Sequence, residues 1–438
     1  MASIIEIKQE EKPSVRRITD IVPGIEFTSM HGNAFSLPKK RNSAHSLQPQ
    51  MLVTECYEEA RKQSYATRTM KAHEYEEDPK TLRLKVEKLA ELILNSKRCV
   101  AYAGAGLSTG AGIQDYASSS TSVVNTTIQK KEDMKSVLPG LSHRVLYALH
   151  CKGHLPELIQ QNHDGLPQKA GFPQHCVNEI HGAWFDPSNP VITMSGHLRN
   201  DLTKRFDRWK KRTDLVLALG TSLAATGADS IVDAVCKMQQ DGAGDFGGAV
   251  IISLQQTYYD DVCALRIFGK LDEVLGMLAD HMKLELQPAG GIYSPRVSPS
   301  SSPAPHVFRV PYDAVTGERS SDNSCLLWDL TVGSRLKIVY GPGDGFIGTV
   351  LRVNGQGHYI IEFPRIVAHN DEWLIRRTLK KWPNEDPRAP REYTMGCWWV
   401  ESAVKGLCDR LPFVPYSGID GDVRGVSGAN DKKRKHKY

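Results

Sequence analysis

Apolar and polar residues recur along the middle of the chain in patterns that predict helices and strands in turn. After the helix-start signal Asp78-Pro79, the spacing of Val86, Leu89 and Ile93 fits one face of an amphipathic helix. Short apolar runs separated by helical patterns follow at 99–103, 158–159, 191–194, 215–219 and 250–254. Because strands that alternate with helices form crossover units, we predict a Rossmann-like parallel sheet with helices on both faces.

The pattern changes near residue 288. Residues 288–305 are rich in Pro, Ser and Gly, which is typical of a linker between domains. Apolar residues then alternate over 336–340 and 347–351 on either side of the turn sequence GPGDG, which predicts a β-hairpin. With further apolar runs at 358–363 and 397–400, we predict a small C-terminal β-barrel of the SH3-like or Tudor-like kind.

These changes divide the chain into five parts. We expect an extended or partly disordered region over 1–80, a sheet domain over 81–287, a linker over 288–325, a β-barrel over 326–412 and a flexible basic tail over 413–438. Four tryptophans stand in or beside the barrel: Trp373, Trp382, Trp398 and Trp399. They either form a cage for a methylated lysine or pack in the barrel core, and packing is the simpler interpretation.

The composition is typical of a folded, water-soluble protein, with 40% apolar and 24% charged residues among 438. We find no apolar stretch long enough to span a bilayer and no secretory layout at the N-terminus, so we expect an intracellular protein. The net charge is +5, and the tail sequence KKRKHK carries five positive charges by itself. We therefore predict no direct nucleic-acid binding beyond this tail. The tail is a nuclear import signal, which favours a nuclear or nucleocytoplasmic location, a patch for acidic partners, or a plain solvated end.

The nine cysteines stand singly, and no two are two to four residues apart. This spacing is typical of reduced intracellular thiols. It also lacks the paired thiolates of a structural zinc site, so we expect no zinc.

Polar and glycine-rich segments follow several of the predicted strands. Gly104 and Gly106 lie in the first of them, where glycines let the backbone approach a pyrophosphate at a helix start, although a tight packing turn is the simpler alternative. The second places Asn162 and Asp164 after a strand. Because the carboxyl ends of parallel strands line one crevice, these side chains are expected to face the glycine turn. The third, EIHG, carries His181, and the fourth, GTSL, ends its strand with hydroxyls that suit phosphate or ribose contacts.

Taken together, the segments GAGLSTGAGIQD, QNHDGLPQKAG, EIHG and GTSL, in this order, resemble the sirtuin family over residues 82–286. The resemblance implies that 81–287 is an NAD-binding catalytic domain, with His181 as the general base and Asn162 and Asp164 at the nicotinamide and its ribose. The cofactor-binding residues that it implies are Gly104, Ala105, Gly106, Ser108, Asp115, Gln161, Asn162, Asp164, Gly220, Thr221, Ser222 and Ser253. A histidine suits the base because both of its proton states are accessible near neutral pH.

Four features depart from the family pattern. Ala117 stands where the family has an arginine, and the interval between His181 and Gly220 has none of the cysteines of the family's zinc ribbon. His163 replaces an aliphatic residue, and we interpret it as a satisfied, partly buried side chain. Ser253 or Gln255 would take the place of the family's usual asparagine as an adenosine contact.

Two classes of function follow. The first is an enzyme, an NAD-dependent deacylase acting on an acylated protein lysine, with histones among the candidate substrates; transfer of ADP-ribose to protein is a variant that needs the same NAD cleavage. The second is a catalytically degenerate scaffold that binds NAD or ADP-ribose, which the departures at Ala117 and at the zinc ribbon favour.

Overall fold

The computed structural model describes residues 75–113, 131–192, 198–223, 227–240, 247–290, 293–321, 324–366 and 390–418, together with the backbone of five short N-terminal strands. These strands are β1 (Val15–Arg17), β2 (Glu26–Thr28), β3 (Ala34–Ser36), β4 (Met51–Thr54) and β5 (Glu74–Glu77). Most of the predicted N-terminal region and residues 419–438 of the predicted basic tail lie outside the described residues. None of the helices in the described ranges is long and apolar enough to cross a membrane.

A six-stranded sheet in the order β11-β10-β9-β6-β7-β8 forms the centre of the first domain, and all its neighbouring strands are parallel. Its strands are β6 (Cys99–Ala103), β7 (Glu157–Gln160), β8 (Val177–Glu179), β9 (Leu215–Leu219), β10 (Gly248–Ile252) and β11 (Leu265–Ile267). The predicted parallel sheet is confirmed. We call this part the sheet domain.

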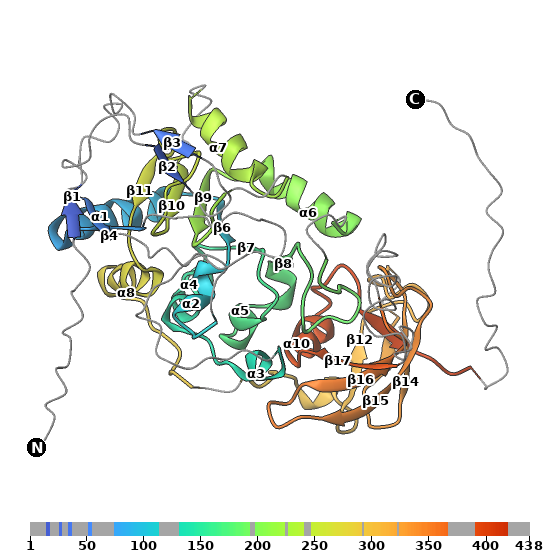
Figure 1. The fold of residues 1–438 in the computed structure, drawn as a ribbon. Helices are drawn as coiled ribbons and strands as arrows, with labels where there is room; N and C mark the ends of the chain where they lie inside the picture. Colours follow the sequence, from blue (N-terminus) through green and yellow to red (C-terminus); the bar gives the residue numbers. More distant parts are fainter. Residues whose placement is uncertain are drawn as a thin grey trace, which may run out of the picture.

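Helices cover both faces of this sheet (Figure 1). Alternate residues of β6 and β9 enter two separate cores: Ala101 and Leu217 pack on one face, and Tyr102 and Val216 on the other. The helices of the first face include α1 (Pro79–Asn95), α4 (Leu141–Cys151) and α8 (Leu271–His281), and those of the second are α6 (Asn200–Lys210) and α7 (Ser230–Gln240). The short helices are α2 (Gly106–Thr109), α3 (Lys131–Ser136), α5 (Leu166–Lys169) and the 3-10 turn η3 (Gln174–Cys176). The helix predicted after Asp78-Pro79 is α1, and the Asp78 carboxylate caps it by accepting from two backbone N–H groups.

The strand predicted over 191–194 is wrong at Val191 and Ile192, which belong to no strand; the rest of that run lies outside the described residues. The edge strand is β8 instead, which has only one apolar residue. Asn178 is fully buried there and its amide donates to the Leu202 carbonyl at 3.0 Å. Because its buried residues are mostly polar and have their own hydrogen-bond partners, such a strand has no apolar run by which the sequence could predict it.

The second domain is a small antiparallel β domain with a five-stranded sheet in the order β17-β16-β15-β14-β18. Its strands are β14 (Arg335–Ile338), β15 (Ile347–Val353), β16 (Tyr359–Phe363), β17 (Arg391–Met395) and β18 (Phe413–Pro415). Strands β14 and β15 form the predicted hairpin. A further hairpin joins β12 (Val307–Val310), which falls in the segment predicted as linker, to β13 (Leu326–Asp329), and a 3-10 turn, η4, spans Pro299–Ser301. Phe308 and Trp328 bury this hairpin in the core of the β domain.

The apolar run 397–400 is not a strand, and this prediction is wrong. Trp398 begins the helix α10 (Trp398–Val404), which connects β17 to β18. Trp398 and Trp399 are 1% and 6% exposed and belong to the core of the β domain, so packing is the correct interpretation for these two tryptophans. Aromatic residues favour strands by propensity, but burial against a neighbouring domain overrides that preference. Trp373 and Trp382 lie outside the described residues.

Candidate functional site

The loops after strands β6, β7 and β9 are joined to one another by backbone hydrogen bonds. Gly104 donates to the Leu219 carbonyl, Gly106 to the Gly220 carbonyl and Gln161 N to the Ala103 carbonyl, each at 2.9 Å. Because these strands are parallel, their carboxyl ends meet at one edge of the sheet. The structure therefore brings together three of the four predicted segments through direct contacts.

Gly104, Gly106 and Gly220 allow two backbone segments to touch. A Cβ on Gly104 would lie 2.8 Å from the Gly220 carbonyl oxygen, and one on Gly106 would lie 2.8 Å from Gly220 Cα. Gly220 also has φ +58°, and a Cβ there would lie 2.6 Å from the Gly106 carbonyl carbon. Close packing of the two loops thus accounts for these glycines without a ligand, which is the simpler of the two interpretations of the turn. It also fixes where the loop backbone stands at the strand ends.

Asn162, Ser108 and Asp164 form a connected polar network. The Asn162 amide donates to the Gly104 carbonyl at 2.9 Å and to Ser108 Oγ at 3.1 Å. Ser108 Oγ donates to Asp164 Oδ2 at 2.6 Å, and Asp164 Oδ1 accepts from Leu166 N at 3.0 Å. Ser108 and Asp164 are 1% and 3% exposed, so the carboxylate sits in a low-dielectric environment with its hydrogen bonds already formed.

A second hydrogen-bond network, centred on the Tyr102 hydroxyl, was not predicted from the sequence. The Tyr102 hydroxyl donates to Asp229 Oδ1 at 2.9 Å and accepts from the Gln161 amide, which also lies 3.4 Å from Thr221 Oγ1. Burial raises the pKa of Tyr102. A tyrosine within an apolar strand is typical of a core position, and its partner Asp229 comes from a distant segment, so no local pattern identifies the pair.

Ser222 is half-buried, and Ser253 is largely committed to other partners. The Ser253 hydroxyl donates to the Gln255 carbonyl at 2.9 Å and accepts from Arg266 Nη2 at 3.1 Å. These bonds use the one donor of the Ser253 hydroxyl and leave it one acceptor lone pair for a further contact. Asp115 and Ala117 lie outside the described residues.

His181 is half-buried in the loop after β8. Burial, and secondly the nearby His163, lower the pKa of His181 to about 4. His163 Nδ1 lies 2.8 Å from the Gly182 carbonyl oxygen, which ties the loop after β7 to the His181 loop. Gly182 has φ +93°, and a Cβ there would lie 2.4 Å from the Pro190 carbonyl oxygen, so the turn beside His181 requires glycine. The arrangement holds a neutral imidazole near the carboxyl edge of the sheet.

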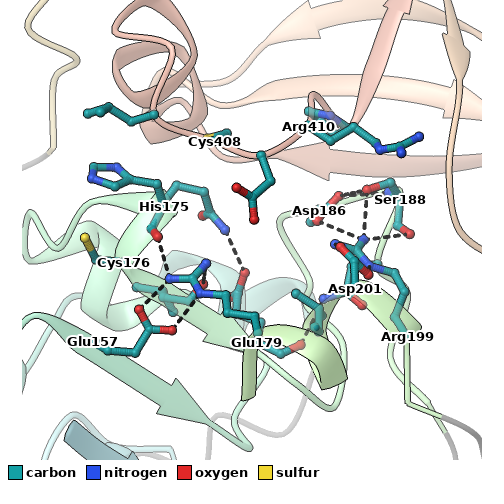
Figure 2. A pocket seen from close by; sticks show the side chains of 18 of the residues that line it. Glu157, His175, Cys176, Glu179, Asp186, Ser188, Arg199, Asp201, Cys408 and Arg410 are labelled. Atoms are coloured by element: carbon teal, nitrogen blue, oxygen red, sulfur yellow. Dashed lines mark hydrogen bonds and ion pairs between the residues drawn. The ribbon is translucent and has the colours of Figure 1, made fainter. Parts of the chain in front are cut away.

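A cavity of about 350 Å³ lies elsewhere, between the sheet domain and the β domain. Figure 2 shows Cys408 and Arg410 of the β domain facing Glu157, Glu179 and Asp186 of the sheet domain. Burial raises the pKa of Glu157 to about 7 and that of Glu179 to about 8, in the second case helped by the charge of Asp186. No predicted site residue lines this cavity, which extends from the amino ends of β7 and β8 to Glu179 at the carboxyl end of β8.

No three His, Cys, Asp or Glu side chains are grouped as a metal site in the described part of the chain. The expected lack of zinc stays a prediction, since residues 193–197 of the interval after His181 are not described.

The fold and the strand-end loops define an α/β protein with a Rossmann-like sheet. In this class of fold, ligands generally bind at the carboxyl ends of the strands. No protein-family model matches the chain. It is 27% identical over 282 residues to the NAD-dependent protein deacetylase sirtuin-7 of Bos taurus and of Homo sapiens, matching 54% of this chain and 68% of each relative. It is also 27% identical over 250 residues to the NAD-dependent protein deacetylase SRT1 of Arabidopsis thaliana, matching 47% of this chain and 51% of that protein.

These relatives match the resemblance that the four sequence segments predicted. The chain is similar to these sirtuin deacetylases over about half of its length. Among solved structures, a complex of Sir2 with a p53 peptide and NAD⁺ is 20% identical, matches 45% of this chain and 99% of its own, and has a TM-score of 0.39.

Proposed function

We propose that the chain is an NAD-dependent protein-lysine deacylase that uses NAD as its cosubstrate and an acylated protein lysine as its substrate. NAD supplies the ADP-ribose that accepts the acyl group, and nicotinamide is released. The proposal is supported by three relatives, from a mammal, a plant and a bacterium, that are each named an NAD-dependent protein deacetylase. The structural observation that carries it is the joining of the predicted loops at one sheet edge, beside a loop that holds a neutral histidine.

The residues at this edge fit a dinucleotide. The connected network of Asn162, Ser108 and Asp164 offers preformed polar groups to a ribose and its amide-bearing base. We propose that the first glycine loop holds the pyrophosphate and that Gly220, Thr221 and Ser222 hold the adenosine side. The proposed contacts are Gly104, Ala105, Gly106, Ser108, Asp115, Gln161, Asn162, Asp164, Gly220, Thr221, Ser222 and Ser253.

His181 is the proposed general base. Its lowered pKa keeps the imidazole unprotonated at neutral pH, so it can accept a proton from a ribose hydroxyl and make that oxygen a better nucleophile. We assign catalysis to residues 81–287, and we propose a nuclear or nucleocytoplasmic location on the basis of the KKRKHK tail.

The deciding experiment incubates the full chain with NAD and an acetyl-lysine peptide and measures both nicotinamide and deacetylated peptide. We expect nicotinamide release that requires the peptide and equals the amount of peptide deacetylated. Label from NAD on a protein acceptor without deacetylation would instead indicate ADP-ribosyl transfer. NAD binding without any turnover would make the chain a scaffold, which the alanine at position 117 favours.

The pH dependence of this reaction tests the state of His181. Because its pKa is lowered to about 4, the base form persists as the pH falls from 8 to 5, and kcat/KM should decline only near pH 4. The free-histidine value of about 6.5 would place that decline about 2.5 pH units higher. Titration of the His181 ring protons by NMR gives the same pKa without relying on activity. A midpoint between 6 and 7 in both measurements would contradict the prediction.

A further inference from the structure

Trp398 of the β domain packs directly on the loop that carries Asp164. This tryptophan is 1% exposed, and ring atoms Cη2 and Cζ2 lie 3.1 Å from where a Cβ on Gly165 would stand. Gly165 has φ +65° and directly follows Asp164, whose carboxylate is bonded to Ser108 and to Leu166 N. The indole therefore packs on the turn that presents Asp164, where the positive φ of Gly165 and a Phe185 ring carbon 2.8 Å from a Cβ there favour glycine.

The same indole is also connected, through a chain of hydrogen bonds, to the strand β8 that leads to His181. Trp398 Nε1 donates to Gln174 Oε1 at 2.9 Å, and the Gln174 amide reaches Glu179 Oε2 at 3.4 Å. Glu179 ends β8, two residues before His181. All three side chains are more than nine-tenths buried, so these bonds form away from competing water.

A third contact holds the segment after His181. The Phe185 ring lies 5.1 Å from the Trp398 ring, and Gly396 N donates to the Phe185 carbonyl at 3.0 Å. Phe185 belongs to the sheet domain by sequence but packs in the core of the β domain. In Figure 1, α10 accordingly lies beside α5.

We propose that Trp398 is a positioning residue through which the β domain holds the Asp164 loop and the His181 loop in place. The β domain is then part of the support of the candidate site and not only an appended module. The expected effect of Trp398 on NAD binding rests on the proposed function. Its expected effect on the stability of the two loops does not.

Trp328 provides a matched control. It is fully buried and its Nε1 donates to the Phe413 carbonyl at 3.1 Å, so it makes the same kind of bond as Trp398 but entirely within the β domain. Replacing either tryptophan with phenylalanine removes one buried N–H donor and retains an aromatic ring. A general loss of β-domain stability would affect both variants alike.

The experiment compares Trp398→Phe and Trp328→Phe in the full chain. Without NAD, we expect faster amide hydrogen exchange over 162–166 and 179–185 in Trp398→Phe alone. With NAD, we expect its dissociation constant and KM to rise by about tenfold in Trp398→Phe, with a smaller change in kcat, and by less than about twofold in Trp328→Phe. Gln174→Leu removes the acceptor, keeps the indole and should act in the same direction, which covers the case that Trp398→Phe does not fold.

Equal exchange in the two tryptophan variants, or loop exchange unchanged from the parent chain, would overturn the inference. If the parent chain binds no NAD, the proposed function fails, and the exchange measurement still decides the role of Trp398.

Discussion

Replacing His181 with alanine is expected to lower the rate of peptide deacetylation by about 10²- to 10⁴-fold, the usual contribution of a general base. The side chain is half-buried, and its lowered pKa keeps it in the base form across the neutral range. Alanine leaves no group in that loop position to accept the hydroxyl proton. NAD binding should survive, because the proposed dinucleotide contacts lie on the other loops. Initial rates of deacetylated peptide, with NAD affinity from calorimetry, measure the two effects separately.

His281→Ala is the control for this variant. His281 is exposed at the last residue of α8, away from the strand-end loops, so its loss should leave the rate unchanged. A His181→Ala protein that binds NAD and retains more than a tenth of the parent rate would remove His181 from the proposed chemistry. Loss of NAD binding together with activity would instead point to a structural role for the loop.

Arg205→Met is expected to destabilise the sheet domain by about 3–5 kcal/mol at pH 8. Arg205 binds Glu157 through two bonds of 2.7 and 2.6 Å, and the side chains are 15% and 3% exposed. Burial already raises the pKa of Glu157 to about 7, and Arg205 opposes that shift. Removing the guanidinium would leave a buried carboxylate without its cation.

The sign of the pH effect depends on this raised pKa. A buried acid with a raised pKa binds a proton more readily in the folded state, so its ionisation lowers stability as the pH rises from about 4.5 through its folded pKa. The loss in Arg205→Met should therefore be larger at pH 8 than at pH 5, where Glu157 is protonated. Urea unfolding at both pH values measures this difference.

Two further variants make the test specific. Glu157→Gln combined with Arg205→Met removes both charges and should recover much of the lost stability. Arg352 and Glu392 form a similar two-bond pair, at 2.9 and 2.6 Å, but are 54% and 51% exposed. Arg352→Met should thus cost less than about 1 kcal/mol at either pH. Equal losses in Arg205→Met and Arg352→Met would show that burial of the first pair has no energetic consequence.

The sequence predicted much of the fold because local patterns report which side of an element meets solvent. The strands 99–103 and 215–219 and the helix after Asp78 were found in this way, and so was the hairpin around GPGDG. The same patterns failed at β8, which buries Asn178 and Glu179, and at 397–400, where aromatic residues suggested a strand and a helix formed.

By itself, the sequence determined the class of the fold and the order of the glycine, amide and histidine segments, because short-range spacing specifies where a strand ends and which residues form the loop after it. Only the tertiary structure decided which partners satisfy the buried polar groups. Three contacts of this kind join residues that are distant in the chain. They are the hydrogen bond between Tyr102 and Asp229, the ion pair between Arg205 and Glu157, and the packing of Trp398 on Gly165. Such contacts depend on how whole elements pack, since burial leaves each polar group with only the neighbours that the fold provides.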